Sequence, residues 1–367
     1  MVGLEFGDNF KVSSESSYPA LDALPEVAVA LRQVEEKILE ATRVPDPLNS
    51  EIISYLAKAG GKRVRPLLAL LGARLGGPIS EPAIDAAVAV ELIHVGSLYH
   101  DDVIDESPTR RGKSSVNANW GNSVAILAGD FVLARASEIG ARLGKRASEL
   151  LARTLGTIVY GQMLELARAY DLDADVDGYM EIVANKTASL ISTSLALGGI
   201  VAAISEDDID TLSEYGNRMG VVFQVVDDIL DIVGDSQRLG KPVGLDMIEG
   251  TYTLPVIYAL EVGGDSSKRL AELLDRIRVA KEQHALVRVG DDGGRRYDIP
   301  TEIESFVDEA RRILLGTGAT KRALERALLE LQRAHELLRS LGESPVVTVL
   351  SGLEQFILGR LPEEGLV

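Results

Sequence analysis

Two aspartate clusters carry the residues best suited to chemistry in this sequence. The spacing DDxxD occurs at residues 101–105 and again at residues 227–231, each time after an apolar run. In a helix, the first and last aspartates of each cluster share one face, and like charges there cost roughly 0.2–0.5 kcal/mol per pair. A divalent cation converts this repulsion into binding, and oxygen ligands suit Mg²⁺, which is commonly shared with substrate phosphates. The clusters consist of Asp101, Asp102, Asp105, Asp227, Asp228 and Asp231.

A single DDxxD cluster is explained about equally well by a solvated helix end. Two copies favour a metal site. If the clusters face each other across a helical bundle, they line a cleft in which several Mg²⁺ ions clamp one diphosphate. Such ions would neutralise a diphosphate leaving group as its charge develops.

Basic residues gather near these clusters, although the chain as a whole is acidic. The net charge of −18 argues against binding to nucleic acid or to anionic membranes. The segment GGKRVRP at residues 60–66 offers flexible glycines and three cationic donors, Lys62, Arg63 and Arg65. A solvated basic turn is the alternative interpretation. The two clusters downstream favour diphosphate binding.

Other polar residues are candidates only in this context. Arg110 and Arg111 follow a proline in a predicted loop, and arginine forks suit phosphate oxygens. His94 lies two helical turns before the first cluster, although a lone histidine is more often a core residue. Lys186 and Thr187 lie in an apolar segment, where a lysine can also snorkel to the surface. The flexible loop at residues 240–246 adds Lys241 as a phosphate donor and Asp246 as a further carboxylate.

Composition restricts the remaining classes. The chain has no cysteine, which excludes disulfides, thiolate zinc sites and thiol nucleophiles. The first twenty residues lack an apolar signal core, and no transmembrane segment is predicted because the longest uncharged run, at residues 187–205, reads as a buried helix. We therefore expect a cytoplasmic protein.

The elements that must position these residues are helices. Apolar residues recur at helical spacing from about Leu24 to Ile357, which predicts an all-α single domain at residues 21–367 after a flexible N-terminal tail at residues 1–20. Residues 284–303 contain an irregular polar insert to which we assign no role. Helices are predicted at residues 24–44, 52–59, from 66, 86–98, 117–134, 145–170, 179–204, 208–233, from about 255, 306–315, 321–341 and 346–358.

From about residue 60 to residue 260, the chain resembles the trans-isoprenyl diphosphate synthases, the polyprenyl synthetase family. The resemblance rests on five ordered motifs: GGKRVRP, HDDVID with RRG, the NKT at residues 185–187, FQVVDDILD, and GKPVGLD followed by TLP. It implies a helical bundle around a deep central cavity, usually a homodimer. It also implies that isopentenyl diphosphate is condensed head to tail with an allylic diphosphate whose departure is assisted by three Mg²⁺ ions.

The resemblance implies roles by matching position. Asp101 and Asp105 match the ligands of two Mg²⁺ ions, with Asp102 supporting them, and Asp227 matches the ligand of the third, with Asp231 nearby. Asp228, Lys186 and Lys241 are also implied in catalysis. Isopentenyl diphosphate would be held by Lys62, Arg65, His94 and Arg111, and the allylic diphosphate by Arg110, Lys186, Thr187, Gln224 and Lys241.

Product length is argued from the residues before the first cluster. In short-chain relatives, a bulky aromatic residue four or five positions upstream closes the floor of the cavity; here these positions hold Ser97 and Gly96. Small residues predict an open floor and a long product of roughly thirty carbons or more, of the quinone side-chain type, although Ile93 or Tyr99 could close it. One departure from the family is Thr251, where many relatives have lysine.

Three other functions compete with this interpretation. A short-chain farnesyl or geranylgeranyl diphosphate synthase would share every motif. A class I terpene cyclase would not need GGKRVRP, and usually lacks a second DDxxD. A non-catalytic partner subunit of a heteromeric synthase would be expected to have lost some of the acidic or basic residues.

Overall fold

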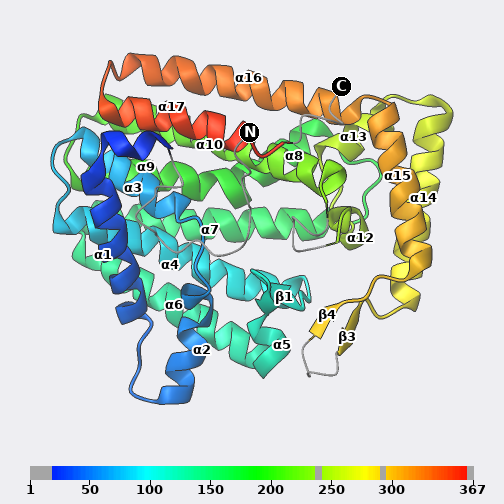
Figure 1. The fold of residues 1–367 in the computed structure, drawn as a ribbon, viewed down its shortest axis with the longest axis horizontal. Helices are drawn as coiled ribbons and strands as arrows, with labels where there is room; N and C mark the ends of the chain where they lie inside the picture. Colours follow the sequence, from blue (N-terminus) through cyan, green and yellow to red (C-terminus); the bar gives the residue numbers. More distant parts are fainter. Residues whose placement is uncertain (1–18, 236–241, 290–294, 362–367) are drawn as a thin grey trace.

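The computed structural model describes residues 19–235, 242–289 and 295–361, and in these ranges the chain is helical apart from two small ribbons (Figure 1). The all-α prediction is therefore confirmed. The helices of the first half are α1 (Pro25–Ala41), α2 (Pro47–Lys58), α3 (Val64–Leu75), α4 (Glu81–Ile104), α5 (Val116–Trp120), α6 (Asn122–Arg142) and α7 (Lys145–Ala167). Those of the second half are α8 (Val176–Val183), α9 (Ser189–Val201), α10 (Glu206–Val233), α12 (Leu245–Glu249), α13 (Leu254–Glu261), α14 (Gly264–Gln283), α15 (Thr301–Gly316), α16 (Ala319–Ser340) and α17 (Pro345–Leu358).

Long helices form the centre of the bundle. In Figure 1, α4, α6, α7, α10 and α16 run roughly along the long axis, with α1 and α2 at one end and α14 and α15 at the other. Helix α4 packs on α3, α6 and α9, and α10 packs on α9 and α16. Helix α4 is long and apolar enough to cross a membrane, but 72% of its apolar window is buried inside the protein, so its composition is that of a core helix.

Helix α10 connects the two hydrophobic clusters of the protein. One of its faces packs in the cluster built on α1–α7 and α9, and the opposite face packs in the cluster built on α12–α16. Its start is well specified, because the Ser205 side chain accepts a hydrogen bond from the Asp208 backbone N–H and three acidic residues follow in the first turn. Because α10 is packed on both faces, the second aspartate cluster near its end is held inside the bundle.

Several predicted helices are interrupted. The helix predicted at residues 117–134 is divided at Gly121, whose φ of +88° separates α5 from α6. The helix predicted at residues 179–204 is divided by η2 (Ala184–Ala188), a single π-helical turn. Helix α14 was not predicted. Pro19 and Ala20, placed in the predicted tail, belong to η1 (Pro19–Ala23), a short 3₁₀ helix, and residues 1–18 lie outside the described residues.

Two antiparallel ribbons complete the described structure. Strands β1 (Thr109–Arg110) and β2 (Lys113–Ser114) flank a turn in which Arg111 and Gly112 both have positive φ, as a tight hairpin requires. Strands β3 (Val287–Val289) and β4 (Arg295–Tyr297) form the second ribbon, with Val287 opposite Tyr297. This ribbon lies in the segment to which no role was assigned, and β4 packs against β1.

Candidate functional site

The two aspartate clusters line one cavity. It has a volume of about 400 Å³ and lies among α4, α7, α8, α10, α12 and the β1–β2 ribbon. Of the residues proposed from the sequence, those that line it are Asp101, Asp105, Arg110, Arg111, Lys186, Thr187, Gln224, Asp227, Asp228 and Asp246. Residues far apart in the chain are thus brought together as the motifs predicted.

The outer aspartates of both clusters occupy an unfavourable electrostatic position. Asp105 caps α4, and Asp227 lies in the last two turns of α10, so the negative ends of both helix dipoles add to their charges. Desolvation raises the pKa of Asp105 to about 6; Lys186 lowers it and Asp101 raises it further. In the protein itself, Asp227 forms an ion pair with Arg360. A cation bound beside these carboxylates would therefore stabilise their ionised form.

The middle aspartates are tied to the protein instead. Asp102 is buried, and Arg110 donates to it from Nε at 2.7 Å. Asp228 is also buried; it accepts from the Tyr179 hydroxyl and from Gln224 Nε2 at 2.8 Å. Burial raises the pKa of the Asp228 carboxyl. Both middle residues therefore orient neighbouring groups, which for Asp102 agrees with the supporting position implied by the resemblance.

Asp231 does not line the cavity in this structure. Its side chain is buried, and its Oδ2 accepts from the backbone N–H of Asp246 at 3.3 Å. Asp228 faces the cavity instead. Thr187 donates to Gln224 Oε1 at 2.8 Å, so that Thr187, Gln224 and Asp228 are linked by hydrogen bonds. This arrangement favours Asp227 over Asp231 as a metal ligand.

Lys186 lies on the π-helical turn η2. Such turns are rare and often occur at functional sites, because the extra residue redirects the side chains of one turn. Burial alone would lower the pKa of Lys186, but Glu165 and Asp101 outweigh it and the pKa is raised. Its ammonium group forms an ion pair with Glu165 of α7 and remains on the cavity.

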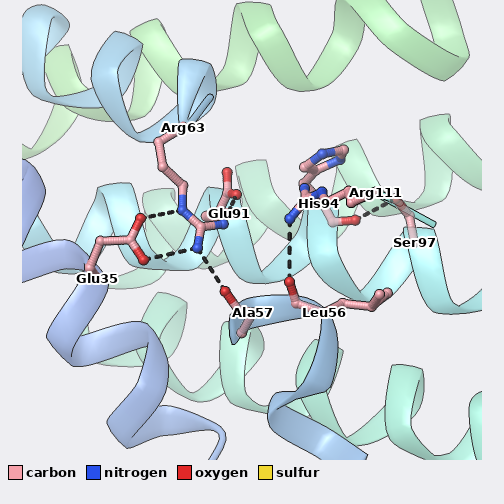
Figure 2. Close-up of polar contacts among 8 residues, drawn as sticks. All are labelled: Glu35, Leu56, Ala57, Arg63, Glu91, His94, Ser97 and Arg111. Carbon is pink, nitrogen blue, oxygen red and sulfur yellow. Dashed lines mark hydrogen bonds and ion pairs between the residues drawn. The ribbon is translucent and has the colours of Figure 1, made fainter. Parts of the chain in front are cut away.

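The GGKRVRP segment divides its arginines between two tasks. Arg63 was predicted as a ligand donor, but it is a structural residue: Figure 2 shows its guanidinium between Glu35 and Glu91, with a further bond to the Ala57 carbonyl. The reason is that the half-buried Glu35 and the buried Glu91 neutralise its charge. Lys62 is exposed, with its ammonium 5.7 Å from the Phe356 ring centroid, and does not line the cavity.

Arg65, Arg111 and His94 form a second basic group beside this ion pair. Burial lowers the pKa of both arginines, Glu91 offsets part of this, and Arg111 lowers the pKa of Arg65 further. Burial followed by the same two arginines lowers the pKa of His94 well below 6.5, so its imidazole is neutral. Arg65 Nε is buried with no hydrogen-bond partner among the described residues, and Arg111 donates to the Leu56 carbonyl at 3.3 Å (Figure 2). This group is suited to an anion.

Gly96, predicted to leave the floor of the cavity open, lies where α4 approaches α6. A Cβ there would lie 2.7 Å from Leu133 Cγ and 3.3 Å from the Gly129 carbonyl, so the missing side chain serves the close approach of α4 and α6. Ser97 hydrogen-bonds to the carbonyl of His94, Ile93 is in the core, and neither lines the cavity. The hydroxyl of Tyr99, which was considered as a possible block, bonds instead to the backbone of α2.

Some residues on or beside the cavity were not proposed from the sequence. Arg168 lines it, and its only ion pair, among the described residues, is a long one of 3.9 Å to Glu181. Tyr297 of β4 and Glu165 of α7 also line it. Arg360 reaches Asp227 from the end of α17. No motif marks them, because their place depends on tertiary packing. Lys241 lies outside the described residues.

The cavity has the donor set that Mg²⁺ prefers. Its acidic lining is made of carboxylate oxygens only, and basic groups stand opposite. Among the described residues, no three acidic or histidine side chains converge closely enough to hold a metal ion by themselves. This fits an ion that completes its shell with water and substrate phosphate.

Comparison with known proteins agrees with the site. The family model for polyprenyl synthetase matches residues 46–288. The chain is 40% identical to nonaprenyl diphosphate synthase of Mycobacterium tuberculosis, over 78% of this chain and 87% of that protein. It is 41% identical to heptaprenyl diphosphate synthase component 2 of Geobacillus stearothermophilus, over 63% and 72%. It is 37% identical to a short chain isoprenyl diphosphate synthase of Methanothermobacter thermautotrophicus, over 83% and 88%.

A solved structure extends the similarity to nearly the whole chain. The polyprenyl synthase of Caulobacter crescentus, crystallised with calcium and isoprenyl diphosphate, superposes with a TM-score of 0.82 at 31% identity. The match covers 94% of this chain and 99% of that one.

Proposed function

The chain belongs to the polyprenyl synthetase family, and from that premise we propose that it is a trans-prenyltransferase that condenses isopentenyl diphosphate with an allylic diphosphate in successive head-to-tail steps. The observation that carries the proposal is the meeting of both aspartate clusters and their basic neighbours in one cavity. A terpene cyclase, which ionises a single substrate, would not need the second basic group at Arg65 and Arg111.

Two different sets of residues bind the two substrates. Lys186, Thr187, Gln224 and Arg110 hold the allylic diphosphate with Lys241, while Arg65, Arg111 and His94, joined by Lys62, hold isopentenyl diphosphate. Asp101, Asp105 and Asp227 hold three Mg²⁺ ions, with Asp231 nearby. Magnesium, when bound, neutralises charge on the departing diphosphate. The protein keeps both substrates aligned, so that the isopentenyl double bond attacks the allylic carbocation left after the bond to diphosphate has broken; a proton lost to the diphosphate then restores the alkene.

We propose a long product, of roughly thirty carbons or more. The nonaprenyl relative, at 40% identity, supports this, whereas the short-chain relative at 37% identity supports the alternative of a short-chain synthase. An open floor at Gly96 and Ser97 stays part of this proposal, and Gly96 also allows the close approach of α4 and α6.

We also propose that the enzyme is a homodimer. Six apolar side chains on α6 and α7 are exposed, and a cluster of this kind is unusual on a monomer. They are Ile126, Leu127, Val159, Tyr160, Met163 and Leu166. The relative described as component 2 names the alternative, a heteromeric enzyme. A cytoplasmic location remains our expectation, which cell fractionation tests.

The test is a product assay with the purified chain, Mg²⁺, labelled isopentenyl diphosphate and farnesyl diphosphate. Chains well beyond twenty carbons support a long-chain synthase, and chains ending at fifteen to twenty carbons support the short-chain alternative. If farnesyl, geranyl and geranylgeranyl diphosphate all fail as primers, the chain is a subunit that needs a partner. Asp101→Asn and Asp227→Asn are expected to abolish incorporation at millimolar Mg²⁺.

A further inference from the structure

The β3–β4 ribbon delivers an aromatic side chain to the proposed diphosphate cavity. It interrupts the helical pattern between α14 and α15, and its base is closed by a hydrogen bond from the Asp298 N–H to the Leu286 carbonyl at 2.8 Å. Strand β4 packs against β1, which carries Arg110, and Figure 1 shows the ribbon beside β1. Tyr297, the last residue of β4, lines the cavity near Asp105 and Arg110.

The tyrosine is anchored at its hydroxyl. The phenol is hydrogen-bonded to the side chain of Ser107, a buried residue between the first aspartate cluster and β1. The Ser107 carbonyl in turn accepts from Ser115 Oγ at 2.6 Å. The anchor is therefore part of the fixed protein framework, and it holds the half-buried ring in one place.

A second cavity adjoins the first and shares Tyr297 with it. Its volume is about 480 Å³, and the ends of α7 and α14 line it through Gln162, Lys281 and His284. Tyr297 lines both cavities, as do Asp105, Glu165 and Glu249. The second cavity is not lined by the second aspartate cluster, Arg110 or Lys186, so it lacks the groups that would clamp a diphosphate.

Water is the chief competitor in the proposed reaction. When the bond between the allylic carbon and its diphosphate breaks, the carbon can be captured by the isopentenyl double bond or by water. Capture by water forms an allylic alcohol and releases diphosphate, which takes the proton that water loses. A synthase must therefore keep water away from this carbon.

We propose that the ring of Tyr297 closes the diphosphate cavity against water entering from the adjoining cavity, and that it favours elongation over hydrolysis as a positioning residue anchored on Ser107. This inference rests on the proposed function. The ring excludes water sterically, and the hydroxyl serves only to hold the ring in place.

The test compares Tyr297→Ala, Tyr297→Phe and Ser107→Ala in the full chain with Mg²⁺, farnesyl diphosphate and isopentenyl diphosphate. The readout is the ratio of allylic alcohol to elongated product, measured in ¹⁸O-labelled water. Label in the alcohol identifies capture at carbon, whereas a phosphatase cleaves the P–O bond and leaves the alcohol unlabelled. We expect the ratio to rise about ten-fold or more in Tyr297→Ala, and only slightly in Tyr297→Phe and Ser107→Ala, which keep the ring.

Arg288→Ala is the matched control, because this exposed residue lies on the opposite face of the same ribbon. It should leave the ratio unchanged. An unchanged ratio in a folded Tyr297→Ala variant overturns the inference, and so does an equal rise in Tyr297→Phe. Failure of the unsubstituted chain to form any elongated product overturns the proposed function itself and is a separate result.

Discussion

Arg168 is a cation on the cavity that is only weakly paired within the protein. Its ion pair with Glu181 is 3.9 Å long, whereas Arg110 and Lys186 have close carboxylate partners. A Cβ on Gly178 would lie 1.4 Å from Arg168 Nη1, so the glycine provides the space that this guanidinium occupies. A weakly paired guanidinium at this place is positioned to bind the allylic diphosphate.

Arg168→Ala should raise KM for the allylic diphosphate by about ten-fold or more, because a hydrogen bond to a charged group contributes about 1.5–3 kcal/mol. KM for isopentenyl diphosphate should change less, and Arg168→Lys should recover part of the loss. Steady-state kinetics with each substrate varied separately measure both. Arg339→Ala, which removes an exposed arginine of α16, is the control. Equal effects on the two KM values would contradict the assignment.

The raised pKa of Asp105 predicts a dependence of Mg²⁺ affinity on pH. The carboxyl must lose its proton before it binds a cation, and a pKa of about 6 means that protons compete below that pH. Affinity should therefore be highest above pH 7 and should fall about ten-fold by pH 5 for each such carboxyl. Titration calorimetry of Mg²⁺ with the substrate diphosphate present tests this. An affinity that stays constant from pH 5 to pH 8 would show that Asp105 is not a ligand.

The sequence was sufficient to predict that the aspartates line a site. It was not sufficient to predict which basic residues face a ligand and which form ion pairs within the protein. DDxxD is a local pattern, and both copies reach the cavity. Arg63 and Arg65 are two residues apart in one motif, yet one is neutralised by Glu35 and Glu91 while the other faces Arg111. That difference depends on where α1 and α4 place their glutamates, which no spacing within the motif reveals.

At the scale of elements, the position of the π-helical turn depends on Gly161 of α7. A Cβ there would lie 2.6 Å from the Lys186 backbone nitrogen and 3.0 Å from the carbonyl carbon of Asn185. The two helices can therefore approach closely enough for Lys186 to meet Glu165 on the cavity.

Gly161→Ala should force η2 away from α7, costing about 1–3 kcal/mol of unfolding free energy and reducing kcat by displacing Lys186. Gly156→Ala on the same helix is the control, because a Cβ there meets nothing within 4 Å. It should be neutral, or stabilise by up to about 1 kcal/mol. Chemical denaturation and kinetics of both variants provide the comparison. A Gly161→Ala enzyme as stable and active as the Gly156→Ala enzyme would refute this account.

Helices were predictable where apolar periodicity was strong, as for α4 and α10. The boundaries inside residues 117–134 and 179–204 were not, because a positive φ at Gly121 and a single π turn leave the apolar pattern intact. The ribbons were also missed, since strands of two or three residues are too short for an alternating pattern. Consequently, the element that brings Tyr297 to the cavity could be located only in the folded chain.

At the scale of the whole molecule, the cavity exists because α4 and α10 present their acidic ends to the same space from different sides of the bundle. Both ends concentrate negative charge at the negative end of a helix dipole, and the surrounding arginines and lysine offset only part of it. The carboxylates at the centre of the protein therefore repel one another, and bound Mg²⁺ and diphosphate together would reduce this repulsion. The same reasoning explains why an acidic chain, with a net charge of −18, binds anionic substrates.

Helices α6 and α7 expose an apolar face. Leu127 and Met163 are 67% and 62% exposed, and a second copy of the chain that buries them would stabilise the assembly by the hydrophobic effect. Leu127→Glu and Met163→Glu should therefore convert a dimer into monomers in sedimentation equilibrium, because each places a charge in an apolar contact. Leu329→Glu introduces the same charge at an exposed leucine of α16 and should leave the dimer intact. A monomeric parent protein, or dissociation by Leu329→Glu alone, would assign this apolar face another role.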